Sequence, residues 1–296
     1  MSPEVKVAIV GAGPAGIAAA MQLKRSGIAP LLFEYGRVGG LLHNANLVEN
    51  YPGFPYGIGG AELAALFRKQ LEHVGVEICC EEVLTLDHTG GDFIIETTGR
   101  MVTAGIVVLA SGTKPQKFTG SEITEGATGK IFYDIDPLRE RTGMMIAIVG
   151  AGDAAFDYAL NLAQKNRAVI INRGSTSRAL PLLQQRAQAS PRIEERTETR
   201  IEKIEGTGEG LVLHLAAPGG KGSLSVDSLL VATGRGPRLD YLVSGLCSRV
   251  GRLQAEGALH LVGDVRQGEY RQATIAVGDG VRAAMQIFHG LRGNAR

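Results

Sequence analysis

The chain has 296 residues and a formal net charge of +1, from 31 Lys and Arg against 30 Asp and Glu. This balance excludes a globally basic nucleic-acid binder and gives no indication of an anionic-membrane partner. Apolar residues (44%) and charged residues (21%) occur in ordinary proportions, which excludes a disordered or collagen-like chain. The 41 glycines are about twice the ordinary usage of roughly 7%, which indicates many tight turns and close approaches of backbone to ligand.

Cysteine content and the N-terminal sequence predict a cellular location. Three cysteines, Cys79, Cys80 and Cys247, are too few and odd in number for a disulfide scaffold. Residues Met1–Lys6 lead directly into a strand pattern, without the features of a secretory leader. No apolar run reaches the ~18–20 residues of a membrane span. We therefore predict a cytoplasmic protein in a reducing compartment, with about two domains at roughly 100–200 residues each.

The N-terminal segment is predicted to form a βαβ unit. The apolar run Val5–Val10 is a strand, Gly11–Gly16 (GAGPAG) is a glycine turn, and an Ala- and Leu-rich helix extends to Arg25. Pro30–Glu34 is a second buried strand, which completes a unit of about 30 residues. A G-x-G-x-x-G turn between a strand and a helix is the setting in which this motif binds a dinucleotide.

Each residue of this motif has a physical role. Gly11 permits the tight bend, Gly13 lets the backbone reach a pyrophosphate, and Gly16 allows close packing of helix against strand. The N-terminus of the following helix adds free N–H groups and a positive dipole. Glu34 ends the second strand, at the position where a carboxylate binds a ribose 2′-hydroxyl.

A loop, a helix and several strands are expected next. Arg37–Gly60 is rich in Gly, Asn and Pro and is long for a connector, which indicates a functional loop. Ala61–Val74 has helical periodicity, and Lys114–Lys130 is predicted to be a polar linker. Short strands are predicted at Val76–Cys80, Val83–Asp87, Phe93–Thr97, Met101–Thr103 and Gly105–Ala110.

A second copy of the first unit follows. The apolar run Met144–Val149 leads into Gly150–Ala155 (GAGDAA), a helix to about Lys165 and a strand at Ala168–Asn172. Gly150 and Gly152 take the first two glycine positions, and Ala155 takes the third, which the motif tolerates. The remaining elements are a helix at Leu180–Arg192, strands at Glu194–Lys203, Leu211–Leu215, Leu229–Ala232 and Leu259–Val262, and a last helix at Ala273–Leu291.

The second unit lacks the acidic residue that ends the second strand of the first. Its strand ends in Ile171-Asn172-Arg173, and an arginine binds a 2′-phosphate that a carboxylate would repel. Arg173, together with Arg178, is therefore predicted to bind the 2′-phosphate of NADP(H). The alternatives are that the domain binds NAD(H) or that Arg173 is only a solvated side chain. The two nested units predict an α/β fold of two Rossmann-like domains, one at 1–114 and 236–296 and an inserted one at 115–235. Hinges are expected at Lys114–Lys117 and Thr233–Arg238.

Several motifs occur together in an order that is specific to one family. The motifs are GAGPAG with Glu34, Gly39-Gly40, Glu49–Pro55 (ENYPGFP), GAGDAA, Ala232-Thr233-Gly234, Gly263–Arg266 (GDVR) and Tyr270–Ala273 (YRQA). With these motifs the sequence resembles, over nearly the whole chain, the low-molecular-weight thioredoxin reductases, which are FAD/NAD(P)H flavoproteins. The resemblance implies FAD on the outer domain, NADP(H) on the inserted domain, and a homodimer.

The resemblance also implies a set of contact residues. Asp264 is expected to bind a ribityl hydroxyl, and the backbone at Arg271–Ala273 to donate to the flavin pyrimidine oxygen. No catalytic side chain is assigned, because hydride transfer needs no acid or base. The FAD contacts are Gly11, Gly13, Pro14, Ala15, Gly16, Glu34, Gly39, Gly40, Leu41, Leu42, Asn50, Val83, Ser111, Gly112, Gly263, Asp264, Arg271, Gln272 and Ala273. The NAD(P)H contacts are Gly150, Gly152, Asp153, Ala154, Ala155, Arg173 and Arg178.

One departure from that family changes the expected chemistry. The redox-active CxxC of thioredoxin reductases aligns with Asp134 and Pro137, whose side chains cannot perform thiol–disulfide exchange. The segment Phe132–Leu160 instead resembles ferredoxin–NADP reductases of the thioredoxin-reductase type, which also lack CxxC. We therefore predict an FAD-dependent oxidoreductase that passes electrons from NAD(P)H to an external carrier such as ferredoxin or flavodoxin.

Alternatives remain open at this stage. A pair formed by Cys79 and Cys80 would make a disulfide or dithiol oxidoreductase, whereas buried free cysteines, as also expected of Cys247, would only pack. The single arginine at the second turn also allows a flavoprotein that does not use NADPH and is reduced by a protein partner. His43 is either a proton donor near the flavin or a packing residue. The sequence contains no Cys/His metal spacing and no nucleophile–base signature.

Overall fold

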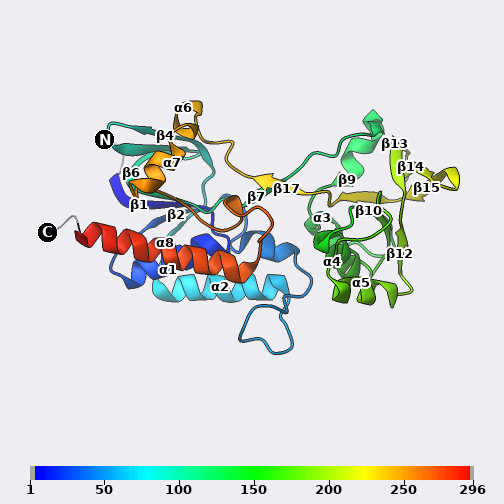
Figure 1. Cartoon of the computed structure of the whole chain (residues 1–296), viewed down its shortest axis with the longest axis horizontal. Helices are drawn as coiled ribbons and strands as arrows, with labels where there is room; N and C mark the ends of the chain where they lie inside the picture. The colour runs from blue at the N-terminus through cyan, green and yellow to red at the C-terminus, as the bar shows by residue number, and fades with distance from the viewer. Residues whose placement is uncertain (1–3, 294–296) are drawn as a thin grey trace. The chain divides into compact units, whose positions relative to one another are not determined.

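The computed structural model describes residues 4–293, which form two compact units (Figure 1). The first unit comprises the described residues up to His43, then Val48–Lys114, and the chain from Gly236 onward. The second unit comprises Asn44–Leu47 and Pro115–Arg235. The division falls after residues 114 and 235, and Asn44–Leu47 belongs to the second unit.

The first unit is built on a sheet with the order β3-β2-β1-β6-β5-β4, in which β18 also pairs with β6. Strands β1, β2, β3, β6 and β18 are parallel, whereas β4, β5 and the first half of β6 form an antiparallel meander. The strands are β1 (Glu4–Val10), β2 (Leu31–Phe33), β3 (Ile78–Cys79), β4 (Val83–Thr89), β5 (Asp92–Thr97), β6 (Met101–Leu109) and β18 (Leu259–Leu261).

Strand β6 corrects one prediction from the sequence. Two strands were expected on either side of Ala104, but the structure has one continuous strand, Met101–Leu109. Its first half pairs with β5 and its second half pairs with β18, while β1 pairs along most of its length. Gly105 does not interrupt it, because partners on both sides hold the backbone extended.

Three long helices lie side by side on one face of this sheet (Figure 1). Helices α1 and α8 lie so close together that a Cβ atom at Gly280 would be only 2.1 Å from the carbonyl oxygen of Ala15. On the other face, Leu246 and Leu253 pack against Phe33, Phe93 and other core residues. The helices are α1 (Pro14–Arg25), α2 (Gly60–Val74), α6 (Ser244–Cys247), α7 (Val250–Ala255) and α8 (Ala273–Gly293), with 3-10 helices η1 (Gly40–Asn44) and η3 (Gly263–Val265).

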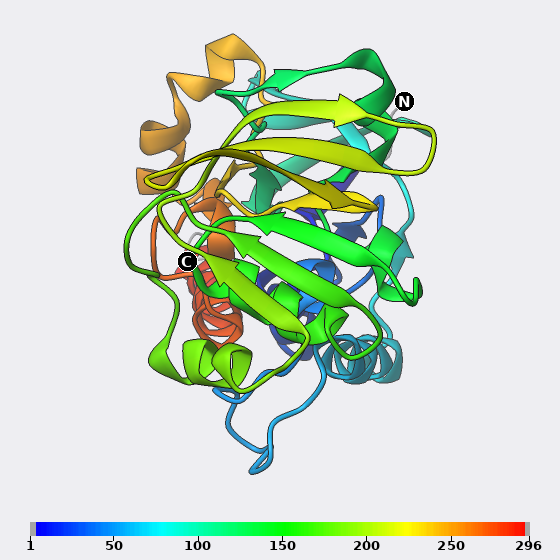
Figure 2. The same cartoon turned by 90° about the vertical axis from the view of Figure 1, so that its right-hand side faces the viewer.

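The second unit has a five-stranded parallel sheet with the order β12-β11-β10-β16-β9. Helices α4 and α5 cover one face, and a four-stranded sheet, β15-β14-β13-β8, covers the other (Figure 2). The strands are β8 (Glu122–Ile123), β9 (Ile131–Phe132), β10 (Met145–Val149), β11 (Arg167–Ile171), β12 (Ile193–Arg196), β13 (Arg200–Gly206), β14 (Leu211–Ala217), β15 (Gly220–Val226) and β16 (Ser228–Val231). The helices are η2 (Glu125–Lys130), α3 (Asp136–Arg139), α4 (Asp153–Leu162) and α5 (Pro181–Gln188).

Three further predictions are corrected here. The strand expected at Glu194–Lys203 is two strands, β12 and β13, because the chain turns at Glu198, which has φ of 49°. The helix expected to reach Arg192 ends at Gln188. The segment predicted as a polar linker contains β8 and η2, and β8 pairs with β13.

The two boundaries between the units fall within short strands that pair with each other. These are β7 (Thr113–Pro115) and β17 (Arg235–Pro237). Gln116 N–H donates to the oxygen of Gly234 at 3.0 Å beside them. The segments predicted to be hinges are therefore paired strands rather than separate loops, and their motion stays a prediction. No helix within residues 4–293 is long and apolar enough to cross a membrane.

Candidate dinucleotide-binding sites

The first glycine turn has the geometry that a bound pyrophosphate requires. Gly11 has φ of +101°, and a Cβ atom there would lie 2.5 Å from the oxygen of Ala110. A Cβ atom at Gly16 would lie 1.9 Å from the oxygen of Gly11. At Gly13, by contrast, a Cβ atom would meet nothing within 4 Å. The first and third glycines are thus fixed by protein packing, while the second faces free space at the start of α1, where Pro14 and Ala15 form the first turn.

The carboxylate of Glu34 is held beside this turn. One oxygen accepts the N–H of Ala12 at 2.7 Å, and the other accepts the N–H of Gly36 at 2.7 Å. Its backbone N–H donates to the oxygen of Cys79 at 2.9 Å, which extends the pairing of β2 with β3. This is the position from which a carboxylate contacts the ribose of a dinucleotide.

The loop after β2 packs on the same turn. Gly39 has φ of +105°, and its N–H donates to the oxygen of Ala12 at 2.7 Å. A Cβ atom at Gly40 would lie 3.3 Å from the Cα atom of Gly13, so η1, with Leu41 and Leu42, runs next to the free space. His43 Nε2 lies 3.0 Å from the oxygen of Val38 in its own loop, and its proposed role as a proton donor stays a prediction.

Residues from distant parts of the sequence meet at this end of the first unit. Asn50 Nδ2 donates to Gln272 Oε1 at 2.8 Å, which joins the loop to the start of α8, where Arg271 and Gln272 precede the helix and Ala273 is its first residue. A Cβ atom at Gly263 would lie 2.8 Å from the Cβ atom of Ala15, so η3, which carries Asp264, lies against the start of α1.

A polar network surrounds the other predicted FAD contacts. Ser111 Oγ donates to the oxygen of Arg238 at 2.7 Å and accepts from the hydroxyl of Tyr241 at 2.9 Å. Burial raises the pKa of Tyr241, so its hydroxyl stays protonated and donates. Gly112, with φ of +63°, accepts the N–H of Arg238 at 3.1 Å. The strand end that carries Ser111 and Gly112 is therefore fixed in place.

The sequence does not indicate three further side chains beside this network, those of Arg238, Tyr35 and Glu82. The guanidinium of Arg238 lies 4.2 Å from the ring centroid of Tyr35 and pairs with a carboxylate oxygen of Glu82 at 2.8 Å. These side chains flank Glu34 and Val83, both predicted FAD contacts. The adjacency of Tyr35 to Glu34 and of Glu82 to Val83 was a usable signal, but only the fold shows that Arg238 joins them.

The second glycine turn repeats the geometry of the first. Gly150 has φ of +143°, and a Cβ atom there would lie 2.4 Å from the oxygen of Ala232. A Cβ atom at Gly152 would meet nothing within 4 Å, and Ala155 is fully buried in the third position. Helix α4 begins at Asp153, and Ala154 is exposed in its first turn. The free space again lies beside the second glycine, at a helix N-terminus.

The loop after β11 folds back onto this turn. Arg178 N–H donates to the oxygen of Ala151 at 2.8 Å, and Leu180 N–H donates to Asp153 Oδ1 at 2.8 Å. Buried Asn172 shapes the loop, since its Oδ1 accepts the N–H of Gly174 at 2.9 Å. Arg173 and Arg178 are exposed and form no ion pair within residues 4–293. Both arginines are available to a phosphate.

Asp134 and Pro137, the positions predicted to align with a redox dithiol, lie just before and at the start of α3. Asp134 Oδ1 accepts Asn44 Nδ2 at 3.0 Å and a guanidinium nitrogen of Arg235 at 3.1 Å. Pro137 lies in the first turn of α3. The carboxylate of Asp134 is therefore held by two hydrogen bonds.

The three cysteines are all free, and they differ in exposure. Cys79 is buried, its Sγ accepts Arg100 at 3.1 Å, and burial raises the pKa of its thiol. Cys80 and Cys247 are exposed, so the predicted packing role is wrong for both. The alternation of side chains along an extended strand explains why the neighbours Cys79 and Cys80 differ.

A half-buried carboxylate, that of Asp157, lies on α4. Asp157 Oδ2 accepts the N–H of Asn46 at 2.8 Å, and Asn161 and Gln164 donate to Asn46 Oδ1 at 3.3 and 3.2 Å. Burial raises the pKa of Asp157 to about 6, although backbone hydrogen bonds from Asn46 and Leu47 act in the opposite direction. These contacts explain why Asn44–Leu47 belongs to the second unit.

Comparison with known proteins agrees with this geometry. The model of the family described as "Pyridine nucleotide-disulphide oxidoreductase" matches residues 5–280. The chain belongs to this family. A thioredoxin reductase of Streptomyces coelicolor is 33% identical over 315 residues, which cover 96% of this chain and 93% of that protein. The mitochondrial thioredoxin reductase 1 of Arabidopsis thaliana is 32% identical over 314 residues, which cover 97% of this chain and 84% of that protein.

Solved structures of the pyridine nucleotide-disulphide oxidoreductases show the same fold. The thioredoxin reductase of Lactococcus lactis has a TM-score of 0.87 at 28% identity and covers 98% of this chain and 99% of its own. The thioredoxin reductase of T. acidophilum has a TM-score of 0.86 at 26% identity, and the match covers 97% of this chain and 99% of that one. The predicted α/β fold and thioredoxin reductase likeness are confirmed. FAD and NADP(H), the predicted cofactors, are those of this family, and the free space beside Gly13 and Gly152 fits them.

Proposed function

We propose that the protein is a flavin-dependent oxidoreductase that passes electrons from NADPH to an external carrier protein such as ferredoxin or flavodoxin, without a disulfide relay. When bound, FAD supplies the chemistry, because it accepts a hydride and releases electrons one at a time. The residues of the chain bind and orient the two nucleotides and exclude water from them.

The lack of a dithiol carries this proposal. The sequence has only Cys79, Cys80 and Cys247, and none of them lies at the aligned positions Asp134 and Pro137. Asp134 is held by two hydrogen bonds and has no redox chemistry of its own. Electrons that reach the flavin must therefore leave it directly.

Two observations support NADPH as the electron donor. The space beside Gly152 fits a pyrophosphate, and the exposed cations Arg173 and Arg178 lie in the loop that contacts this turn. Exposed arginines bind a 2′-phosphate with charge-assisted hydrogen bonds. This geometry disfavours a flavoprotein that is reduced only by a protein partner.

Thioredoxin is the second candidate acceptor, because the relatives are named thioredoxin reductases. Its reduction would require Cys79 and Cys80. The thiol of Cys79 is buried, whereas Cys80 is exposed, so the two sulfur atoms do not share one accessible site. The proposed homodimer and the cytoplasmic location stay predictions.

An acceptor assay tests the proposal. The FAD-loaded protein is mixed anaerobically with NADPH and with ferredoxin, flavodoxin or oxidised thioredoxin in turn, and reduction of each carrier is followed. We expect reduction of a one-electron carrier and none of thioredoxin. The variant Cys79→Ser/Cys80→Ser is the control. Reduction of thioredoxin alone, abolished in this variant, would refute the proposal and establish the dithiol alternative.

A further inference from the structure

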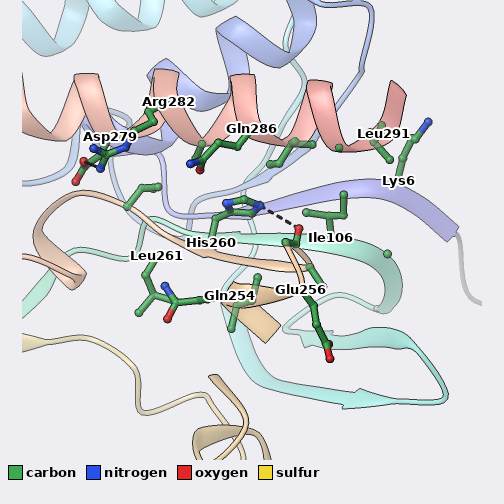
Figure 3. Close-up of a pocket in the computed structure, with 18 of the residues that line it drawn as sticks. Lys6, Ile106, Gln254, Glu256, His260, Leu261, Asp279, Arg282, Gln286 and Leu291 are labelled. Atoms are coloured by element: carbon green, nitrogen blue, oxygen red, sulfur yellow. Dashed lines mark hydrogen bonds and ion pairs between the residues drawn. The ribbon is translucent and has the colours of Figure 1, made fainter. Parts of the chain in front are cut away.

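The first unit contains a second pocket, of about 1060 Å³, between β18 and α8 (Figure 3). The ends of β1, β6 and α7 complete its walls. None of the predicted FAD contacts lines it, so it is separate from the dinucleotide site. Its volume lies at the upper end of the roughly 300–1,000 Å³ of typical small-molecule sites.

The acidic side chains of this pocket are neutralised by the protein. Glu256 pairs with Arg252, with 2.7 Å between a carboxylate oxygen and Nε. Asp279, which is 5% exposed, pairs with Arg282 and also accepts Gln267 Nε2 at 2.9 Å. These two acids therefore leave no unbalanced negative charge.

Two of the basic side chains are not neutralised. Lys6, at the start of β1, and Arg266, just after η3, line the pocket and are exposed. Neither forms an ion pair or hydrogen bond through its side chain with another residue among those that the structure describes. The pocket therefore carries a net positive charge, which favours an anionic ligand.

The middle of the pocket carries no charge. Ile106 and Leu261 line it together with the amide side chain of Gln286, and the His260 ring lies between α8 and β18. His260 Nε2 lies 3.1 Å from the oxygen of Gly257, to which it donates, and burial lowers the pKa of the ring. A neutral imidazole adds a flat surface without charge.

The cationic groups lie at opposite ends. Figure 3 shows Lys6 beside Leu291, near the C-terminal end of α8, and Arg282 beside Asp279, in the first half of this helix, with His260 between them. Arg266 belongs to the Asp279 end, because its N–H bonds to Gly263, whose own N–H bonds to Asp279. We propose that this pocket binds an elongated organic dianion, with an acidic group at each end and an uncharged middle.

Linear dicarboxylates from adipate to hexadecanedioate are suitable probes, because they scan the distance between the two ends. Isothermal titration calorimetry with the FAD-loaded protein should show saturable binding, one molecule per chain, with an optimum chain length. The monocarboxylate of the same length should bind about tenfold more weakly or worse, since it loses one charged contact worth about 1.4 kcal/mol or more. The flavin spectrum should show that FAD stays bound.

Matched variants locate the site. Lys6→Gln and Arg266→Gln should each weaken binding of the best dicarboxylate about tenfold, whereas Lys69→Gln, the same charge change on α2 outside the pocket, should not. Gly290→Leu should abolish binding by filling the pocket, and it should still fold, because a Cβ atom at Gly290 meets nothing within 4 Å. Absence of saturable binding, or equal binding by wild type and Gly290→Leu, would overturn the proposal.

Discussion

Replacing Asp157 with asparagine removes the half-buried carboxylate on α4. Burial raises the pKa of Asp157 from 3.8 to about 6, a difference of roughly two pH units. A pKa difference of one corresponds to about 1.4 kcal/mol. Ionisation of the carboxylate therefore destabilises the folded state by on the order of 3 kcal/mol at neutral pH. An asparagine oxygen in the same place still accepts the N–H of Asn46. We expect Asp157→Asn to be more stable than wild type at pH 7, by up to about 3 kcal/mol.

The sign of this effect fixes its pH dependence. Because the pKa is higher in the folded state, the unfolded chain loses its proton first as the pH rises. Relative to that of Asp157→Asn, the unfolding free energy of wild type is therefore highest below about pH 4, where Asp157 is protonated in both the folded and the unfolded state. It falls as the pH rises to about 6. Above that range the advantage of the variant is constant.

Urea unfolding followed by circular dichroism, at several pH values across this window, measures the difference in unfolding free energy. Glu209→Gln, which changes an exposed acid of the same unit, is the control and should follow wild type. A difference between Asp157→Asn and wild type that is independent of pH, or a variant less stable at pH 7, would contradict the reasoning. It would show that the hydrogen bonds to the carboxylate outweigh its burial.

Three further predictions concern the nucleotide sites and the thiols. Arg173→Ala should raise the KM for NADPH about tenfold or more and leave the KM for NADH nearly unchanged, because a charged hydrogen bond is worth about 1.5–3 kcal/mol. Equal changes in the two KM values, measured in steady-state assays, would count against a contact with the 2′-phosphate. Gly11→Ala should lower Tm and lose FAD, since its Cβ atom would lie 2.5 Å from a carbonyl oxygen; a stable yellow variant would disprove this constraint. Cys79→Ser/Cys80→Ser should leave reduction of a one-electron carrier unchanged, and loss of that activity would revive the thiol alternative.

The glycine turns could be predicted because their requirements are local. Gly11 and Gly150 both need positive φ, and both follow an apolar strand and precede a helix. The position of Glu34 beside the first turn also follows from its place at a strand end. Sequence periodicity and turn chemistry determine such features within about 30 residues.

Features that depend on distant contacts could not be predicted in the same way. The pairing of Arg238 with Tyr35 joins residues about 200 positions apart, and no local pattern marks it. Asn44–Leu47 lies in the second unit because of hydrogen bonds to α4, although its neighbours in sequence belong to the first. The sequence predicts two strands on either side of Ala104, and only the tertiary pairing with β1, β5 and β18 shows that they form one.

The number of electrons that the protein accepts tests the central claim, that no disulfide relay accompanies the flavin. The FAD-loaded protein is titrated anaerobically with NADPH while the flavin absorbance is followed. Without a dithiol, one equivalent of NADPH per FAD should complete the reduction, because each NADPH delivers a single hydride. A requirement for two equivalents per FAD would reveal a second two-electron centre and contradict the account.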